Sequence, residues 1–336
     1  MSAPPGFWDR RGPAALALLP LALLFRAVVW VRHLLHAWGW RRVVRLPVPV
    51  VVVGNITVGG TGKTPLVIAL ANALAVRGLH PGIVTRGYGG SARGIGAVVP
   101  DSDPERVGDE PLLLARRAGC PVWRGADRVA AATALLAAHP ECDCLISDDG
   151  LQHLRLARDV EIAVVDGARG LGNGLPLPAG PLREPPARLR AVDAVVINGA
   201  GATGLPPGTT LTLEGYRLVN LASGDKVLPL EAWRGHRVHA VAGIGHPRRF
   251  FDQLRAAGLQ VVEHPFPDHH PFTAGDLVFD AALPVVMTEK DAVKCARFAR
   301  EEWWCLPVEA RLDPAFFDMV GARLRRGAKR ASAAAS

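Results

Sequence analysis

The chain has 336 residues, enough for two domains that each bury a core. Its 39 Lys and Arg outnumber its 31 Asp and Glu, and the net charge of +8 suits anionic partners such as phosphorylated substrates or phospholipid surfaces. With two tyrosines and no basic–aromatic repeat, the sequence lacks the features of a base-stacking surface, so we expect no nucleic-acid partner. The five cysteines are scattered, without the spacing of a zinc site or a disulfide framework.

Residues 1–45 are predicted to form a helical region that associates with a membrane. Pro13–Val31 is almost wholly apolar, but Arg26 interrupts it and Pro20 would kink it. It therefore falls short of the roughly 20 clean apolar residues of a spanning helix. Tryptophans and arginines follow, as is typical of a helix at headgroup depth: Trp38, Trp40, Arg41, Arg42 and Arg45. A helix packed against the folded domain is an equal alternative. Both interpretations hold if one face of the helix packs against the domain and the opposite face meets lipid.

A phosphate-binding loop follows the first predicted strand, Val48–Val53, and opens the helix predicted over Leu66–Arg77. Glycines let backbone N–H groups point inward, and the helix N-terminus adds its positive dipole end. Lys63 can then reach the β- and γ-phosphates of a nucleotide, and the Thr64 hydroxyl can bind Mg²⁺. Thr57 stands where the strict motif has glycine, and the double glycine before Thr61 compensates for it. The predicted nucleotide-binding residues are Thr57, Val58, Gly59, Gly60, Thr61, Gly62, Lys63 and Thr64.

Two further candidate positions follow in the predicted parallel sheet. A strand over Pro81–Thr85 ends at Arg86 and Tyr88, at the edge where α/β sheets bind ligands. Arg86 could pair with a phosphate, although an ordinary turn explains it equally well. Asp109 precedes the helix predicted over Glu110–Ala118, and a role as N-cap is favoured there over a catalytic role.

An acidic element is expected beside the phosphate-binding loop. The strand Cys144–Ser147 ends in Asp148 and Asp149, and Asp166, after the strand Ile162–Val165, is the competitor. We favour the aspartate pair because Gln152 and His153 add polar groups to the same rim. Other elements predicted up to the boundary at residues 199–208 are a strand over Val122–Trp123, a helix over Asp127–Ala138 and a strand over Ala194–Ile197.

The alternation of strands and helices predicts the α/β class: a P-loop NTPase-like α/β/α sandwich with a second, smaller α/β domain. The predicted parts are a kinase-type domain over 46–208, a short extended linker over 209–235, the smaller domain over 236–326 and a disordered tail over 327–336. The smaller domain includes the helix predicted over Pro314–Arg325. It also carries Asp268 and His269, which from spacing alone are better explained as a surface turn.

The motifs of the chain, taken in their order along the sequence, resemble those of the tetraacyldisaccharide 4′-kinase family, the ATP-dependent kinases of lipid A biosynthesis. The resemblance covers nearly the whole chain. Beyond the N-terminal helix the motifs are Gly54-Asn55 with Thr57 to Pro65, Thr85 to Gly89, Gly108 to Pro111, Asp148 to His153, Pro178 to Glu184, Asp268-His269 and Thr288 to Lys294. Leu151 stands where the family usually has Phe, a conservative departure.

The resemblance implies ATP with Mg²⁺ bound between two domains, and phosphorylation of the 4′-hydroxyl of an acylated glucosamine disaccharide 1-phosphate. It implies a peripheral enzyme, expected to be a monomer, on the cytoplasmic face of the bacterial inner membrane. Asp109 would be the general base and His269 its partner. Thr64, Asp148, Asp149 and Gln152 would serve the metal, and Arg86, Tyr88 and His153 the substrate.

Two other classes of protein share part of the pattern. A membrane-associated deviant P-loop ATPase of the partitioning type would have the same loop and a membrane helix, but not a second α/β unit with an Asp-His pair. A GTPase metallochaperone needs an N/T-K-x-D motif, and Thr288-Glu289-Lys290-Asp291 has the wrong spacing for it. The kinase interpretation is therefore favoured.

Overall fold

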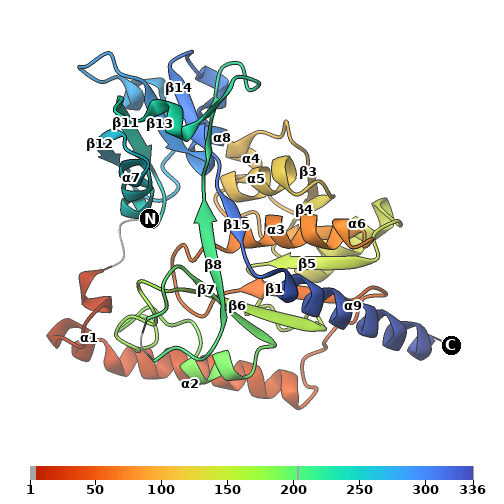
Figure 1. The fold of residues 1–336 in the computed structure, drawn as a ribbon. Helices are drawn as coiled ribbons and strands as arrows, with labels where there is room; N and C mark the ends of the chain where they lie inside the picture. Colours follow the sequence, from red (N-terminus) through yellow and green to blue (C-terminus); the bar gives the residue numbers. More distant parts are fainter. Residues whose placement is uncertain (1–4, 203, 336) are drawn as a thin grey trace.

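The computed structural model describes residues 5–202 and 204–335 and contains two β-sheets (Figure 1). The larger has nine strands in the order β15-β8-β7-β6-β1-β5-β2-β4-β3, and the strands from β8 to β4 pair in parallel. Its strands are β1 Val50–Gly54, β2 Pro81–Thr85, β3 Gly96–Val98, β4 Val122–Arg124, β5 Cys144–Asp148, β6 Val160–Asp166, β7 Ala194–Asn198, β8 Thr209–Glu214 and β15 Glu309–Arg311.

Helices cover both faces of this sheet because its central strand is apolar on both sides. All five residues of β1 are buried, and alternate ones belong to different cores. Val51 and Val53 pack with α3, α5 and α9, whereas Val50 and Val52 pack with α6. The result is the predicted α/β/α sandwich. Its helices are α3 Lys63–Val76, α4 Pro104–Val107, α5 Asp109–Arg117, α6 Arg128–Ala138, η2 Pro186–Arg190 and α9 Pro314–Ala335.

The smaller sheet has six strands in the order β10-β9-β14-β13-β11-β12. Phe250, Phe251 and Leu254 of α7 pack on one of its faces, and Ala292 and Cys295 of α8 on the other. Its elements are β9 Arg217–Asn220, β10 Val227–Pro229, η3 Leu230–Trp233, β11 Arg237–Ala242, α7 Pro247–Ala256, β12 Gln260–Pro265, η4 Ala274–Leu277, β13 Val285–Thr288, α8 Glu289–Cys295, η5 Ala296–Phe298 and β14 Trp303–Leu306.

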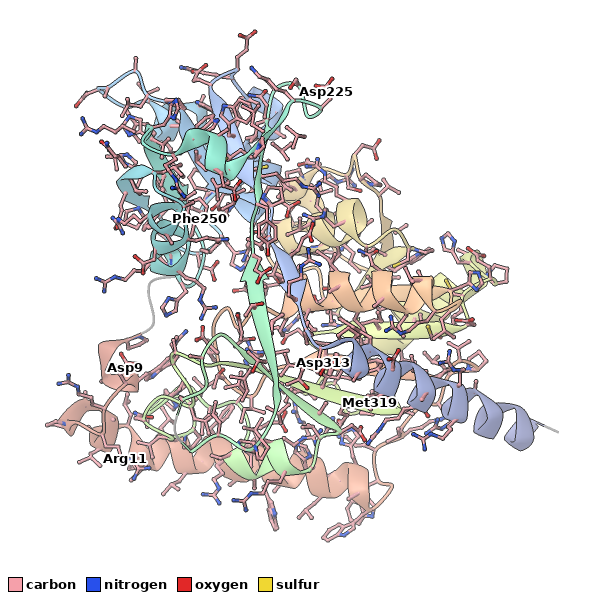
Figure 2. All side chains as sticks on the ribbon, in the orientation of Figure 1. Asp9, Arg11, Asp225, Phe250, Asp313 and Met319 are labelled. Atoms are coloured by element: carbon pink, nitrogen blue, oxygen red, sulfur yellow. The ribbon has the colours of Figure 1, made fainter. Side chains whose placement is uncertain are left out.

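The connections between the sheets differ from the prediction. The predicted linker is divided: β8 extends the large sheet, and β9 begins the small one. The chain then returns, since β15 pairs with β8, and α9 packs on the large core through Phe316, Val320 and Leu324. Figure 2 shows Met319 on this helix, beside the large sheet. Assigning residues 309–326 to the smaller domain was therefore wrong, because an apolar stripe at helical spacing does not reveal which sheet it covers.

The tail predicted to be disordered is part of the same helix, which continues to Ala335. Alanine makes up half of this stretch, and alanine has the highest helix propensity of all residues. A polar, Ala-rich sequence without its own apolar stripe can thus extend a helix that is anchored earlier in the chain.

The N-terminal region forms η1 Gly6–Trp8, α1 Pro13–Ala17 and α2 Leu19–Ala37, which runs along one side of the large domain (Figure 1). Pro20 lies in the first turn of α2, where proline is tolerated, so it does not break the helix. By length and composition α2 could cross a membrane, with 19 residues and a mean hydropathy of 1.3, a test that some core helices and signal sequences also meet. Most of its apolar side chains are exposed.

Candidate active site

The loop between β1 and α3 is held in a conformation that requires glycine. Gly59 and Gly62 have φ angles of 110° and 91°, and a Cβ atom at Gly62 would overlap the Asn198 side chain. That amide donates to the Thr61 carbonyl at 3.0 Å, and the Val58 N–H donates to the Pro181 carbonyl at 2.8 Å. These contacts fix the loop in a glycine-dependent turn that leads directly into α3, with Lys63 as the first residue of that helix.

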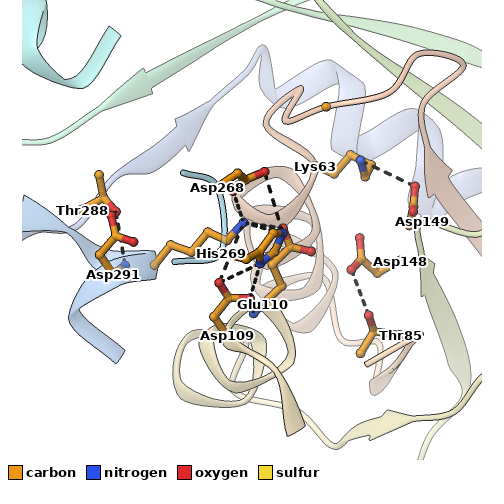
Figure 3. Close-up of polar contacts among 12 residues, drawn as sticks. Lys63, Thr85, Asp109, Glu110, Asp148, Asp149, Asp268, His269, Thr288 and Asp291 are labelled. Carbon is orange, nitrogen blue, oxygen red and sulfur yellow. Dashed lines mark hydrogen bonds and ion pairs between the residues drawn. The ribbon is translucent and has the colours of Figure 1, made fainter. Parts of the chain in front are cut away.

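The aspartate pair lies opposite this loop, at the end of β5 (Figure 3). Asp148 is buried and accepts a hydrogen bond from the Thr85 hydroxyl at 3.1 Å, while its Oδ1 has no hydrogen-bond partner among the described residues. Burial, with the charges of Glu110 and Asp149, raises the pKa of Asp148 to about 7. A positive charge placed beside Asp148 would therefore stabilise the ionised form of its carboxyl group.

Asp149 differs from its neighbour because cations surround it. Lys63 Nζ lies 3.5 Å from one carboxylate oxygen, and an Arg183 nitrogen lies 3.3 Å from both. Burial opposes ionisation, but Lys63 and Arg183 outweigh it and lower the pKa of Asp149. Its φ of 49° is unusual for a residue with a side chain. The competitor Asp166 instead binds Arg249 at 3.2 Å and the N–H groups of its own turn.

Asp109 and His269, 160 residues apart, meet across the two domains. The Nδ1 atom of His269 lies 3.0 Å from both Asp109 oxygens. Burial opposes ionisation of Asp109, but the hydrogen bond from His269 and the nearby Lys290 and Lys294 ammonium groups lower its pKa to about 2. Asp109 is the first residue of α5, and Gly108 is the N-cap. The N-cap predicted at Asp109 therefore lies one residue earlier in the chain. His269 and Asp149 are the two non-glycine residues with positive φ in the described chain, and both border one cleft.

That cleft has a volume of about 890 Å³ and is bordered by both domains and by α2. Lys63, Asp149, Asp268 and His269 line it, as do Arg86, Tyr88, Gln152 and His153. The Tyr88 ring meets the His269 ring edge to face, with centroids 5.2 Å apart. Asp148 and Asp109 are buried and are not among the residues that line it. The structure thus brings the predicted residues of two distant sequence regions to one cavity.

Two of the rim residues, Gln152 and His153, differ in how far the large domain already engages them. Gln152 donates to Glu184 at 2.7 Å and to the Asn55 carbonyl at 3.0 Å. Burial and the nearby Arg128 lower the pKa of His153 to about 4, so its imidazole is neutral near pH 7. The Gln152 amide group is therefore held by the protein, whereas the neutral imidazole of His153 can donate one hydrogen bond and accept another.

Among the charged residues of the cleft that had no role in the sequence-based prediction are Glu110, Arg128, Arg183 and Lys290. Glu110 follows Asp109 directly, whereas Arg183 and Lys290 stand in the motifs Pro178 to Glu184 and Thr288 to Lys294. For Arg183 and Lys290, their place in these motifs was the only signal in the sequence. Arg128, the first residue of α6, carried none.

Comparisons with known proteins agree with these features. The family model for tetraacyldisaccharide-1-P 4′-kinase matches residues 14–325. A tetraacyldisaccharide 4′-kinase from Azoarcus sp. strain BH72 is 54% identical over 332 residues, covering 97% of each chain. One from Alkalilimnicola ehrlichii is 56% identical over 329 residues, covering 97% of this chain and 98% of the relative.

A solved structure extends the similarity to the fold. The crystal structure of LpxK from Aquifex aeolicus in complex with ATP matches with a TM-score of 0.78 and 28% identity, covering 93% of this chain and 98% of that one. The resemblance inferred from the motifs and the predicted P-loop kinase fold are both confirmed. The alternative of a partitioning ATPase is not favoured.

Proposed function

Since this chain belongs to the tetraacyldisaccharide-1-P 4′-kinase family, we propose that its cleft between the two domains performs the family's reaction. The chain is a kinase of lipid A biosynthesis, which transfers phosphate from ATP to the 4′-hydroxyl of tetraacyldisaccharide 1-phosphate. One observation carries the assignment of residues: the loop of the large domain and His269 of the small domain border the same cavity, and His269 contacts the buried Asp109 at 3.0 Å.

Lys63 and the loop glycines would hold the ATP phosphates. The Lys63 ammonium is paired with Asp149 at 3.5 Å, and it can turn from that carboxylate to the β- and γ-phosphates. A lysine there neutralises the charge on the transferring group, which is the main task of a protein in phosphoryl transfer. Arg86 and Arg128 add positive charge to the same cavity.

The residues beside the loop fit a magnesium ion. No group of three His, Cys, Asp or Glu side chains within residues 5–202 and 204–335 could hold a metal alone. Mg²⁺ usually takes one or two carboxylates together with phosphate oxygens and waters, so a complete protein cage is not required. Asp148, with its partnerless Oδ1 and raised pKa, and the Thr64 hydroxyl would hold it, with Asp149 and Gln152 on the same rim. When bound, the ion would neutralise charge on the phosphate oxygens.

Asp109 would accept the proton of the 4′-hydroxyl as its oxygen attacks the γ-phosphorus and the bond to ADP breaks. A pKa of about 2 makes it a weak base that is fully ionised near pH 7. Phosphoryl transfer passes through a loose transition state, so a correctly placed carboxylate matters more than a strong base. His269 holds the carboxylate in place through Nδ1.

Helix α2 would bring the lipid acceptor to this site at the cytoplasmic face of the membrane. Phe25, Val28 and Val29 line the cleft, whereas Trp30 and Trp38 are 62% and 65% exposed. One apolar wall therefore leads from the reacting groups to a surface suited to lipid headgroups and acyl chains. All the proposed catalytic groups come from one chain, which is compatible with a monomer.

Transfer of labelled phosphate from ATP to lipid A disaccharide 1-phosphate in detergent micelles tests this assignment. Lys63→Ala should abolish transfer without unfolding the protein. Asp109→Asn should lower kcat roughly 10²- to 10⁴-fold and change the KM for ATP little. The matched control is Asp103→Asn, because Asp103 caps α4 outside the cleft and asparagine also caps helices. Full specific activity of Asp109→Asn with reduced thermal stability would instead mean that Asp109 is structural.

A further inference from the structure

Lys290, the second residue of α8, lies at the centre of the charged groups that join the two domains. Its Nζ is 3.0 Å from Glu110 Oε1 on α5 and 3.2 Å from Asp268 Oδ1. It is also 3.3 Å from His269 Nε2 and 4.0 Å from the Asp109 carboxylate. The side chain is 16% exposed and borders the cleft.

The two nitrogens of His269 have different neighbours. Nδ1 faces the Asp109 carboxylate, which accepts hydrogen bonds but cannot donate them when ionised. Nε2 faces the Lys290 ammonium, which donates hydrogen bonds but cannot accept them. The arrangement is satisfied by one protonation state: a neutral imidazole with its proton on Nδ1 and its lone pair on Nε2 directed at Lys290.

We propose that Lys290 is a positioning residue for the kinase reaction, which fixes the tautomer of His269 and keeps the imidazole neutral, so that the Asp109–His269 pair can accept the substrate proton. This inference rests on the proposed role of Asp109 as the base. It gives a function to a residue of the Thr288 to Lys294 motif that does not touch the phosphate-binding loop.

The surrounding charges explain why a cation is needed at this place. Two carboxylates lie near the imidazole, those of Asp109 from α5 and Asp268 from its own loop, and a third, that of Glu110, lies beside the Lys290 ammonium. Without Lys290 they would favour the imidazolium, and a pair that already holds the extra proton accepts another less readily. The other charged group nearby is Lys294, 3.8 Å from Asp109 and 2.8 Å from Asp291, and Tyr88 packs on the ring.

Lys290 stays charged over the working pH range. Burial disfavours its ammonium, but the carboxylates of Glu110, Asp109 and Asp268 outweigh that effect and raise its pKa. A donor that never loses its proton can hold one tautomer of its neighbour at every pH at which the enzyme works.

The dependence of kcat on pH tests the proposal. In Lys290→Met the acidic limb of the profile should move to higher pH by about one unit or more, because the imidazole is protonated more easily. The control is Arg117→Gln, which breaks the 2.7 Å pair with Glu289 in the same contact between α5 and α8 but does not touch the pair of Asp109 and His269. It should lower thermal stability and leave the acidic limb in place. An unmoved limb in Lys290→Met, or an equal shift in both variants, would overturn the proposal.

Side-chain ¹⁵N NMR of the unmodified protein gives an answer that does not depend on whether Lys290→Met folds. The His269 signals, assigned by their loss in His269→Gln, should show a protonated Nδ1 and an unprotonated Nε2 at pH 7. A proton on Nε2 would contradict the proposal. If the NMR result is as expected but Asp109→Asn keeps full activity, the proposed base is wrong while the tautomer assignment stands.

Discussion

Asp148 is the side chain at the site that lowers the stability of the folded chain. It is buried, and its carboxylate accepts a hydrogen bond from Thr85 through one oxygen. Its pKa is raised from 3.8 to about 7, so ionising it costs free energy in the folded state but not in the unfolded one. The folded protein therefore holds an extra proton between about pH 4 and pH 7, and its stability falls as the pH rises through that range.

Asp148→Asn should remove this loss of stability together with the activity. The free energy of unfolding should exceed that of the parent by up to about 4 kcal/mol at pH 8, and by little at pH 4, where the parent carboxyl is also protonated. Urea unfolding in EDTA at both pH values measures the difference. Asp149→Asn is the control with the opposite sign, because Lys63 and Arg183 stabilise that ionised carboxylate. A destabilised Asp148→Asn at pH 8 would mean that the buried charge is not the source of the loss.

At the scale of residues, the sequence was most informative where polar and charged residues come directly after a predicted strand. The turn between β1 and α3 could be predicted because glycine, lysine and threonine at that spacing, between a strand and a helix, are typical of a turn that binds phosphate. Its binding of a nucleotide stays a prediction. Asp109 and His269 could not be paired from spacing, because they are 160 residues apart and only the packing of α8 on α5 brings their loops together. Lys290 needs the same packing to acquire its neighbours.

At the scale of elements, α2 has two different faces. Ala22 is buried, Phe25, Val29 and His33 are partly buried, and these residues follow helical spacing along the side that meets the large domain. The opposite side exposes Leu21, Leu24 and Trp30 by more than half. The packed helix left open by the sequence therefore describes one face of α2, and the exposed apolar face is the one that we expect to meet a membrane interface.

The arginines after α2 should contribute unequally to membrane binding. All three arginines are exposed, but Arg45 donates to Asp159 at 2.9 Å and is held against the domain by that ion pair. Replacing Arg41 and Arg42 by Gln should weaken binding to anionic vesicles about 30-fold, because each basic residue near such a surface contributes roughly 1 kcal/mol. Arg45→Gln is the control and should change binding little. Co-sedimentation at two salt concentrations measures both, and unchanged binding of the double variant would mean that this end of α2 does not meet lipid.

The limits of prediction are clearest for α9. Its apolar stripe predicted a helix correctly, but a stripe carries no information about its partner, and the helix follows the small sheet in sequence while packing on the large one. The chain crosses between the sheets twice, at Gly215 and between β14 and β15. Return of the chain to a sheet that it left about 100 residues earlier is a tertiary property that local periodicity cannot encode.

At the scale of the whole molecule, the small domain completes the site. A Cβ atom at Gly245, after β11, would lie 3.2 Å from the Gly60 nitrogen, so the two domains meet at the phosphate-binding loop itself. Arg249 of α7 reaches Asp166 at 3.2 Å, and Lys290 joins Asp268 to Glu110. The proposed reacting groups thus depend on contacts between domains, because neither domain alone carries the whole proposed set.

The proposed chemistry depends most on Asp109 of the large domain and His269 of the small domain acting as one unit. The most direct test is a double-mutant cycle on kcat with Asp109→Asn, His269→Ala and both changes together, using saturating ATP and disaccharide acceptor. Groups that act as a unit are non-additive, so the double variant should be within a few-fold of Asp109→Asn alone. Losses that multiply would contradict this coupling, because they would mean that His269 contributes independently of Asp109.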